Sequence, residues 1–189
     1  MLITPLTPLD AVNEILSSIG ESPVNTLDDP SNIDVINAIR ILDTVTKQVQ
    51  QKGWSFNSVS SYTLMPDRFT REIAWDNQLL RVKSAEGNIL RKRNGIVYDV
   101  TNNTDKFTSN IEVEAVTLVN FEDMPEVFRE YVTARAARVF SARYLGDDGL
   151  LQVLAQEEQL AYSAMMEYEI DIEEPSMANN MDIMNMMKR

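Results

Sequence analysis

The feature that most constrains the fold is a change of hydrophobic period along the chain. Apolar residues recur at helical spacing through residues 1–53, alternate with polar residues in 54–121, and return to helical spacing from Pro125. An amphipathic helix buries one stripe of side chains, spaced three or four residues apart, whereas a half-buried strand buries every second side chain. The two periods therefore predict different elements. We therefore expect helices on both sides of an inserted β region.

Two helices are predicted in residues 1–53. In the first, Thr7 is the expected N-cap, Pro8 takes the first helical position and Gly20 ends the helix. The second has an apolar stripe and an opposite polar side, and Gly53 is its expected stop. The stripe consists of Val35, Ile39, Leu42, Val45 and Val49, and the polar side of Arg40, Asp43, Lys47 and Gln50.

The inserted region, residues 54–121, carries strand and hairpin signals. Ile111, Val113 and Ala115 alternate with glutamates, as a half-buried strand requires. Asn94-Gly95 stands between two apolar runs, and both residues tolerate positive φ, so a tight hairpin is predicted there. Glu86-Gly87 is a weaker hairpin signal.

Helical spacing after Pro125 predicts two further helices. Phe128, Val132, Ala136 and Val139 are expected inward, with Arg129, Arg135, Arg138 and Arg143 outside. A last helix is expected from about Leu150 to Tyr168. The short connection makes these helices antiparallel neighbours, so arginines of one oppose glutamates of the other.

The predicted fold class is α+β: a predominantly helical bundle of about four helices, with a small antiparallel β insert between the second and third long helices. The expected parts are N-terminal bundle helices (1–53), the β insert (54–121), C-terminal bundle helices (122–170) and a Met-rich flexible tail (171–189).

Composition excludes several kinds of chemistry. The 189 residues include no Cys and no His, which removes thiol catalysis, cysteine metal sites and the usual general base near neutral pH. No glycine-rich phosphate loop is present, and we expect no cofactor. No run approaches the roughly 20 apolar residues of a membrane span, and the N-terminus lacks a signal peptide pattern. We expect a soluble protein made in the cytoplasm.

The net charge of −12 is unevenly distributed. Residues 1–145 hold 15 basic and 19 acidic side chains, whereas residues 146–187 hold no basic and ten acidic side chains. Bulk nucleic acid is a disfavoured partner, because binding it requires clustered Lys and Arg. The negative charge therefore belongs mainly to the last quarter of the chain.

Acidic pairs are the remaining candidates for catalysis or metal binding. Glu157-Glu158, Glu112/Glu114 and Glu173-Glu174 are available for glycoside hydrolysis. Such pairs are expected by chance among 29 acids, and sequential neighbours point to different sides, so solvated faces are the preferred interpretation. Asp147-Asp148 is interpreted as a helix-hairpin turn rather than a divalent-cation site.

Two sequence features suggest contact with partners. Arg91-Lys92-Arg93 is the only dense basic run, and it fits either an acidic partner or protection of a sheet edge. Seven of the ten methionines lie between Met165 and Met187. Met165 and Met166 suit core packing, whereas Met181, Met184, Met186 and Met187 suit a partner-binding tail.

One block of the chain is too specific to follow from helix formation alone. It is Ala11–Val24, with the sequence Ala-Val-Asn-Glu-Ile-Leu-Ser-Ser-Ile-Gly-Glu-Ser-Pro-Val. Together with further blocks, it resembles the tail tubular protein A family of short-tailed bacteriophages over roughly residues 9–170. The further blocks are Asn37–Leu42, Gln51–Asn57, Thr63–Pro66, Val97–Asp99, Met124–Arg129 and Glu167–Glu169.

This resemblance implies a structural virion protein without catalytic residues, synthesised in the host bacterial cytoplasm and located at the head-to-tail junction of the virion. In the family, twelve copies form an adaptor (gatekeeper) ring below the portal. The nozzle protein (tail tubular protein B) attaches beneath the ring, and tail fibres dock at its periphery. DNA passes through the channel without specific binding, and no membrane insertion is implied.

The resemblance turns the charged and Met-rich features into interface hypotheses. Arg135 and Arg138 are expected to contribute to subunit contacts, against Glu157 and Glu158 of a neighbouring copy. The tail from Met177 is expected to contact the portal or an adjacent subunit. Two other function classes stay open: a carboxylate-dependent glycan hydrolase, and an assembly chaperone that is absent from finished particles.

Overall fold

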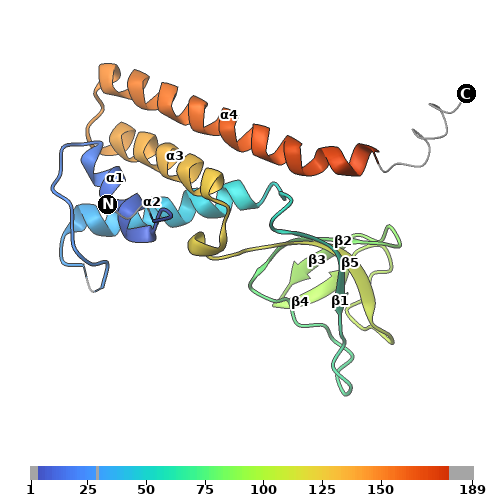
Figure 1. Cartoon of the computed structure of the whole chain (residues 1–189). Coiled ribbons are helices and arrows are strands. Elements are labelled where there is room, and N and C mark those ends of the chain that lie inside the picture. Colours follow the sequence, from blue (N-terminus) through green and yellow to red (C-terminus); the bar gives the residue numbers. More distant parts are fainter. Residues whose placement is uncertain (1–3, 29, 179–189) are drawn as a thin grey trace, which may run out of the picture. The chain divides into compact units, whose positions relative to one another are not determined.

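The structure, a computed structural model, describes residues 4–28 and 30–178. They divide into two compact units. The helical unit comprises the described residues as far as Val49 and again from Asn120, and the β unit comprises Gln50–Val119. Figure 1 labels the elements of both. None of the described helices combines the length and apolar character needed to cross a membrane.

The helical unit contains α1 (Pro8–Ser17), α2 (Ile33–Gln50, whose last residue belongs to the β unit), the short 3-10 helix η1 (Phe121–Asp123), α3 (Glu126–Tyr144) and α4 (Asp148–Ala178). The predicted start of α1 is confirmed. Thr7 and Asp10 form a reciprocal capping box, and Pro8 opens the helix. The buried positions of α1 are Ala11, Val12, Ile15 and Leu16.

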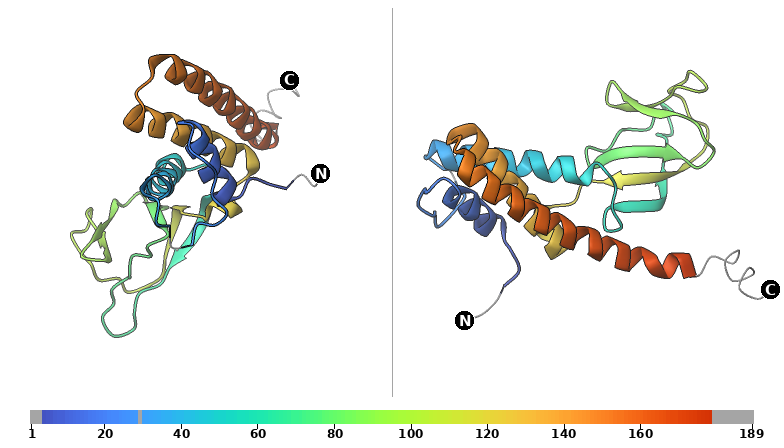
Figure 2. Two further views of the ribbon diagram at one scale, coloured as in Figure 1. Left: turned by 90° about the vertical axis from the view of Figure 1, so that its left-hand side faces the viewer. Right: turned by 90° about the horizontal axis from the view of Figure 1, so that it is seen from above.

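Helices α3 and α4 form an antiparallel hairpin, and the views in Figures 1 and 2 show them side by side. Phe128, Val132 and Ala136 of α3 are buried as predicted. Phe128 meets Tyr168 of α4 edge to face, with ring centroids 6.2 Å apart. The last helix is longer than expected, because α4 continues past Tyr168 and through Pro175 to Ala178.

Two polar residues of the helical bundle pattern lie inside rather than outside. Arg129 donates from Nη1 to the Leu6 carbonyl oxygen at 2.9 Å and pairs with Glu126 at 2.7 Å, so only 12% of its side chain is exposed. Gln50, expected on the solvent side, is buried. Its amide donates to the Val119 carbonyl oxygen and accepts from the Val119 N–H, both at 2.9 Å.

The β unit contains five strands in two antiparallel sheets. One sheet has the order β1-β5-β2, from β1 (Ser58–Leu64), β5 (Ile111–Thr117) and β2 (Leu79–Ser84). The other pairs β3 (Leu90–Arg93) with β4 (Ile96–Asp99). The Asn94-Gly95 hairpin is confirmed, since both residues have positive φ, 51° and 80°. Glu86-Gly87 instead lies in the connection between β2 and β3, which belong to different sheets.

The predicted fold, a predominantly helical bundle with one small β insert, is wrong. The structure is 45% helical and 18% strand, and its strands form two sheets, so α+β describes it only loosely. The physical reason is that the β region forms a separate hydrophobic core. Both sheets and their connections contribute buried side chains to that core: Leu64, Ile73, Leu79, Val82, Leu90, Val97, Phe107, Val113 and Ala115.

Candidate functional site

The predicted Arg–Glu contact between α3 and α4 exists inside a single chain. Arg138 Nε donates to the Glu158 carboxylate, and their side chains are 38% and 15% exposed. This hydrogen bond raises the pKa of Arg138. Arg135 lies nearby but donates to Tyr131 Oη at 3.3 Å and to Gln48 Oε1 at 3.4 Å. The structure thus brings Arg138 and Glu158 together and gives Arg135 other partners.

Glu157 belongs to an acidic cluster shared by three helices. Its carboxylate and that of Glu130 on α3 act on Glu14 of α1. Partial desolvation, followed by the repulsion from Glu157 and Glu130, raises the pKa of Glu14. The cluster costs stability when all three carboxylates are ionised. Glu158 is paired with Arg138, whereas Glu157 acts on Glu14, so the two neighbouring glutamates have different surroundings.

The basic run Arg91-Lys92-Arg93 lies exposed on β3 of the β unit. Arg93 stacks over the Tyr98 ring, 4.7 Å from its centroid, and Lys92 Nζ lies 3.4 Å from Asn77 Oδ1. Within the described part of the chain, no ion pair neutralises these three cations. The run remains available to an acidic partner.

The structure describes two of the methionines singled out in the sequence and leaves the other four outside the described residues. Met165 is fully buried, as expected for a core residue, and Met166 is half-buried. Met181, Met184, Met186 and Met187 lie outside the described residues. Their proposed role in partner binding therefore stays a prediction.

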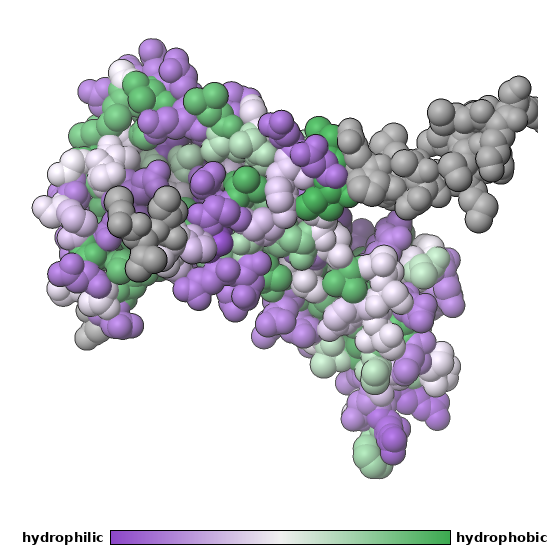
Figure 3. All heavy atoms as spheres, in the orientation of Figure 1, coloured by the Kyte–Doolittle hydropathy of each residue, from purple (hydrophilic) through white to green (hydrophobic). Residues whose placement is uncertain are grey.

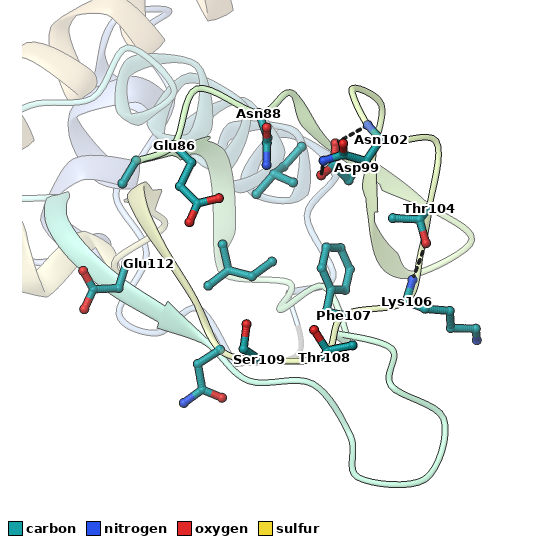
Figure 4. Close-up of a pocket in the computed structure, with 14 residues that line it drawn as sticks. Glu86, Asn88, Asp99, Asn102, Thr104, Lys106, Phe107, Thr108, Ser109 and Glu112 are labelled. Atoms are coloured by element: carbon teal, nitrogen blue, oxygen red, sulfur yellow. Dashed lines mark hydrogen bonds between the residues drawn. The ribbon is translucent and has the colours of Figure 1, made fainter.

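A polar pocket of about 610 Å³ opens between loops of the β unit, and Figure 4 shows its lining. Asp99 is buried there, and its carboxylate accepts from the Asn102 backbone N–H at 3.0 Å and side-chain amide at 2.8 Å. Lys106 points outward and pairs with Glu72. Asp99 and Lys106 are thus committed to the protein's own structure, whereas Glu86 and Glu112 also line the pocket.

Asp147 and Asp148 serve the helix-hairpin turn. Asp147 Oδ1 accepts from the Leu150 backbone N–H at 2.8 Å, which satisfies one free N–H in the first turn of α4. Among the described residues, no group of three or more acidic side chains is arranged to hold a metal ion. The turn interpretation of this pair is supported.

Sequence reasoning missed the exposed apolar side chains. Phe69, in the loop after β1, is 94% exposed, and Leu160 on α4 is 72% exposed. Figure 3 shows hydrophobic patches between hydrophilic ones along α4 and at the tip of the loop. The available signal was Arg68-Phe69-Thr70-Arg71 directly after Pro66-Asp67, an aromatic residue within a polar turn.

A model of the tail tubular protein family matches residues 9–175. No curated protein matches the chain.

Proposed function

Because the chain belongs to the tail tubular protein family of phages, we propose that it forms the adaptor ring that joins the portal of the phage head to the tail nozzle. Membership of this family implies a structural role in the tail of the virion. The family match carries the proposal, since residues 9–175 include the β unit and most of the helical unit.

In the proposed assembly, twelve copies close into a ring beneath the portal. The nozzle protein, tail tubular protein B, attaches below this ring, and tail fibres dock at its periphery. The proposed contact residues are the charged residues of α3 and α4, the basic run of β3 and the methionines beyond residue 178. The charged residues are Arg135, Arg138, Glu157 and Glu158, and the basic run is Arg91–Arg93. Closed rings of identical copies use two different, complementary surfaces on each copy.

The charge of the chain supports a role beside DNA rather than on it. Twelve copies carry a charge of about −144, twelve times that of one chain. A conduit lined by carboxylates repels the phosphates of DNA, so the genome slides without adhering. The acidic residues of α4 that take no part in subunit contacts are the proposed source of that lining. Because the same charge opposes ring closure, the subunit contact must also contain apolar or oppositely charged groups.

Imaging of purified virions by cryo-electron microscopy tests this function. We expect a ring of this chain between the portal and the nozzle. Phage that lack the protein should accumulate heads without tails, and expression of the full chain in the host should restore them. A particle that lacks the chain, or carries it elsewhere, contradicts the proposal, and absence from finished particles favours an assembly chaperone.

Deletion of residues 179–189 tests the proposed contact of the tail segment. The truncated chain should fold but attach less efficiently to heads. Normal attachment would show that the methionines of this segment do not bind the portal or an adjacent subunit. Release of reducing sugar from host-envelope glycan by the full protein, lost on a single Asp or Glu substitution, would instead support the glycan hydrolase function.

A further inference from the structure

The loop that follows β1 presents an aromatic side chain to solvent. Phe69 is 94% exposed and Met65, four residues earlier, is 68% exposed. In Figure 1 this loop is the teal segment that extends beyond β1. Single exposed apolar residues are common on protein surfaces, so the exposure of Phe69 acquires meaning only from how the loop holds it.

Hydrogen bonds around Asp67 fix the shape of the loop. Asp67 Oδ1 accepts from the backbone N–H groups of Phe69 and Thr70, each at 2.9 Å. The Asp67 N–H donates to the Glu72 carbonyl oxygen at 2.8 Å, and the Arg71 N–H donates to the Asp67 carbonyl oxygen at 2.9 Å. Bonds from Thr70 and Phe69 lower the pKa of Asp67. Phe69 is therefore presented by an ordered turn, which reduces the entropy lost on binding.

The charge that this loop offers to a partner is positive. Arg68 and Arg71 are exposed, and neither forms an ion pair with another described residue. The acidic residues of the loop are committed elsewhere: Asp67 accepts the backbone N–H groups, and Glu72 pairs with Lys106. The loop tip thus combines one aromatic anchor with two guanidinium groups.

A surface of opposite character lies on α4. A shallow hollow of about 360 Å³ has Tyr162, Met166 and Ile170 in its lining, with Glu167 and Asp171 beside them. Ile170 is 52% exposed. No described ion pair involves either acid, and the sequence from 146 to 187 contains no Lys or Arg. The hollow therefore offers apolar contact within a negative field.

We propose that the loop tip of one copy docks into the α4 hollow of a second copy, with Phe69 against Met166 and Ile170 and with Arg68 and Arg71 beside Glu167 and Asp171. Aromatic and arginine side chains are the residues most often found at the energetic centre of interfaces. Because loop and hollow are different surfaces, the contact is head-to-tail, the kind that closes rings. This inference rests on the proposed ring and identifies the two surfaces through which neighbouring copies bind each other.

Cross-linking tests the geometry directly, because the natural chain has no cysteine. Two variants, Phe69→Cys and Ile170→Cys, are prepared separately and then mixed under mild oxidation. We expect a disulfide-linked dimer of one variant with the other, and a ladder of larger species from the double variant. A disulfide forms only when the two Cα atoms approach within about 7 Å. Absence of the mixed dimer, or closure of the double variant within single chains, would overturn the proposal.

Affinity measurements test the energetics. Phe69→Ser should raise the Kd for self-association, measured by sedimentation velocity, by about 30-fold or more. Ile89→Ser is the matched control, because Ile89 is an exposed apolar residue of another loop in the β unit. Folding should be unaffected in both variants, since neither side chain is buried, and circular dichroism checks this. Equal Kd values for Phe69→Ser and the natural chain would contradict the docking.

Charge exchange tests the electrostatic part. Arg68→Glu with Arg71→Glu should weaken association, as should Glu167→Arg with Asp171→Arg, and the four changes together should restore most of it. Arg40→Glu with Lys47→Glu makes the same change of net charge on α2 and should have a smaller effect. Failure of the restoration overturns this contact. Unchanged ring formation by Phe69→Ser chains at the same protein concentrations refutes the contact alone, whereas the absence of this chain from the virion refutes the proposed function.

Discussion

Arg138 of α3 and Glu158 of α4 are joined by an ion pair within one chain. The sequence suggested two uses for such residues, one inside the bundle and one between subunits. Because the guanidinium of Arg138 already holds Glu158, charge reversal at Arg138 changes the stability of the monomer as well as any subunit contact. The stability effect must be measured first.

Replacement of Arg138 by Met should destabilise the helical unit by about 1–2 kcal/mol. The apolar stem is retained, but Glu158, with only 15% of its side chain exposed, loses its partner. The expected cost is below that of a fully buried pair, because Arg138 is partly solvated. Urea unfolding followed by circular dichroism reports on the described helices, nearly all of whose residues belong to the helical unit. The double variant Arg138→Met/Glu158→Met should be less destabilised than Arg138→Met.

Replacement of Asn57 by Ala should destabilise the β unit by about 2–4 kcal/mol. The buried amide accepts from the Trp54 N–H at 2.8 Å and donates to the carbonyl oxygens of Gln50 and Thr117. Its loss removes these three hydrogen bonds from the interior of the β unit. Fluorescence of the two tryptophans, both in the β unit, follows the unfolding. Asn110→Ala, at an exposed position, is the control and should change stability by less than about 0.5 kcal/mol.

Gly53 and Gly87 should differ in their tolerance of alanine. Both have positive φ, 80° and 83°, so each substitution strains the backbone by about 1 kcal/mol. An added Cβ at Gly53 would also lie 2.8 Å from Val116 Cγ2 and from Arg81 Nη2, whereas nothing lies within 4 Å at Gly87. Overpacking adds about 1–3 kcal/mol at Gly53. Similar tryptophan-monitored stabilities of the two variants would contradict this difference.

Glu14→Gln should stabilise the helical unit near neutral pH by only about 0.2–0.5 kcal/mol, because Glu14 is exposed and solvent screens the repulsion. Desolvation and the carboxylates of Glu157 and Glu130 raise the pKa of Glu14 in the fold, so its ionised form costs stability. As pH falls through the raised pKa toward the ordinary one, the natural chain recovers that stability. The advantage of the variant should therefore be present at about pH 7 and vanish by about pH 4. Thermal unfolding of Glu21→Gln, an exposed site, provides the control.

Local elements were predictable because their causes lie within a few residues. The Thr7–Asp10 capping box and the Asn94-Gly95 turn depend on neighbours close in sequence, and both are confirmed. Gln50 was misplaced, although a wider pattern contained the signal. Gln50 lies four residues after Thr46, which is buried. The buried positions of α2 recur at spacings of three and four residues, and this period places Gln50 on the buried face of the helix. The positions that precede it are Leu42, Val45, Thr46 and Val49.

The sequence by itself determined that helices flank a β region, where α1 begins, the tight turn between β3 and β4, the unequal distribution of charge and the resemblance to a tail protein. Only the tertiary structure decided that the β region closes its own core from two sheets and that Gln50 bonds Val119, 69 residues away. It also decided that Arg138 holds Glu158 and that Phe69 stays in solvent. Caps and turns depend on short-range sterics and hydrogen bonds, whereas burial depends on which distant segments meet.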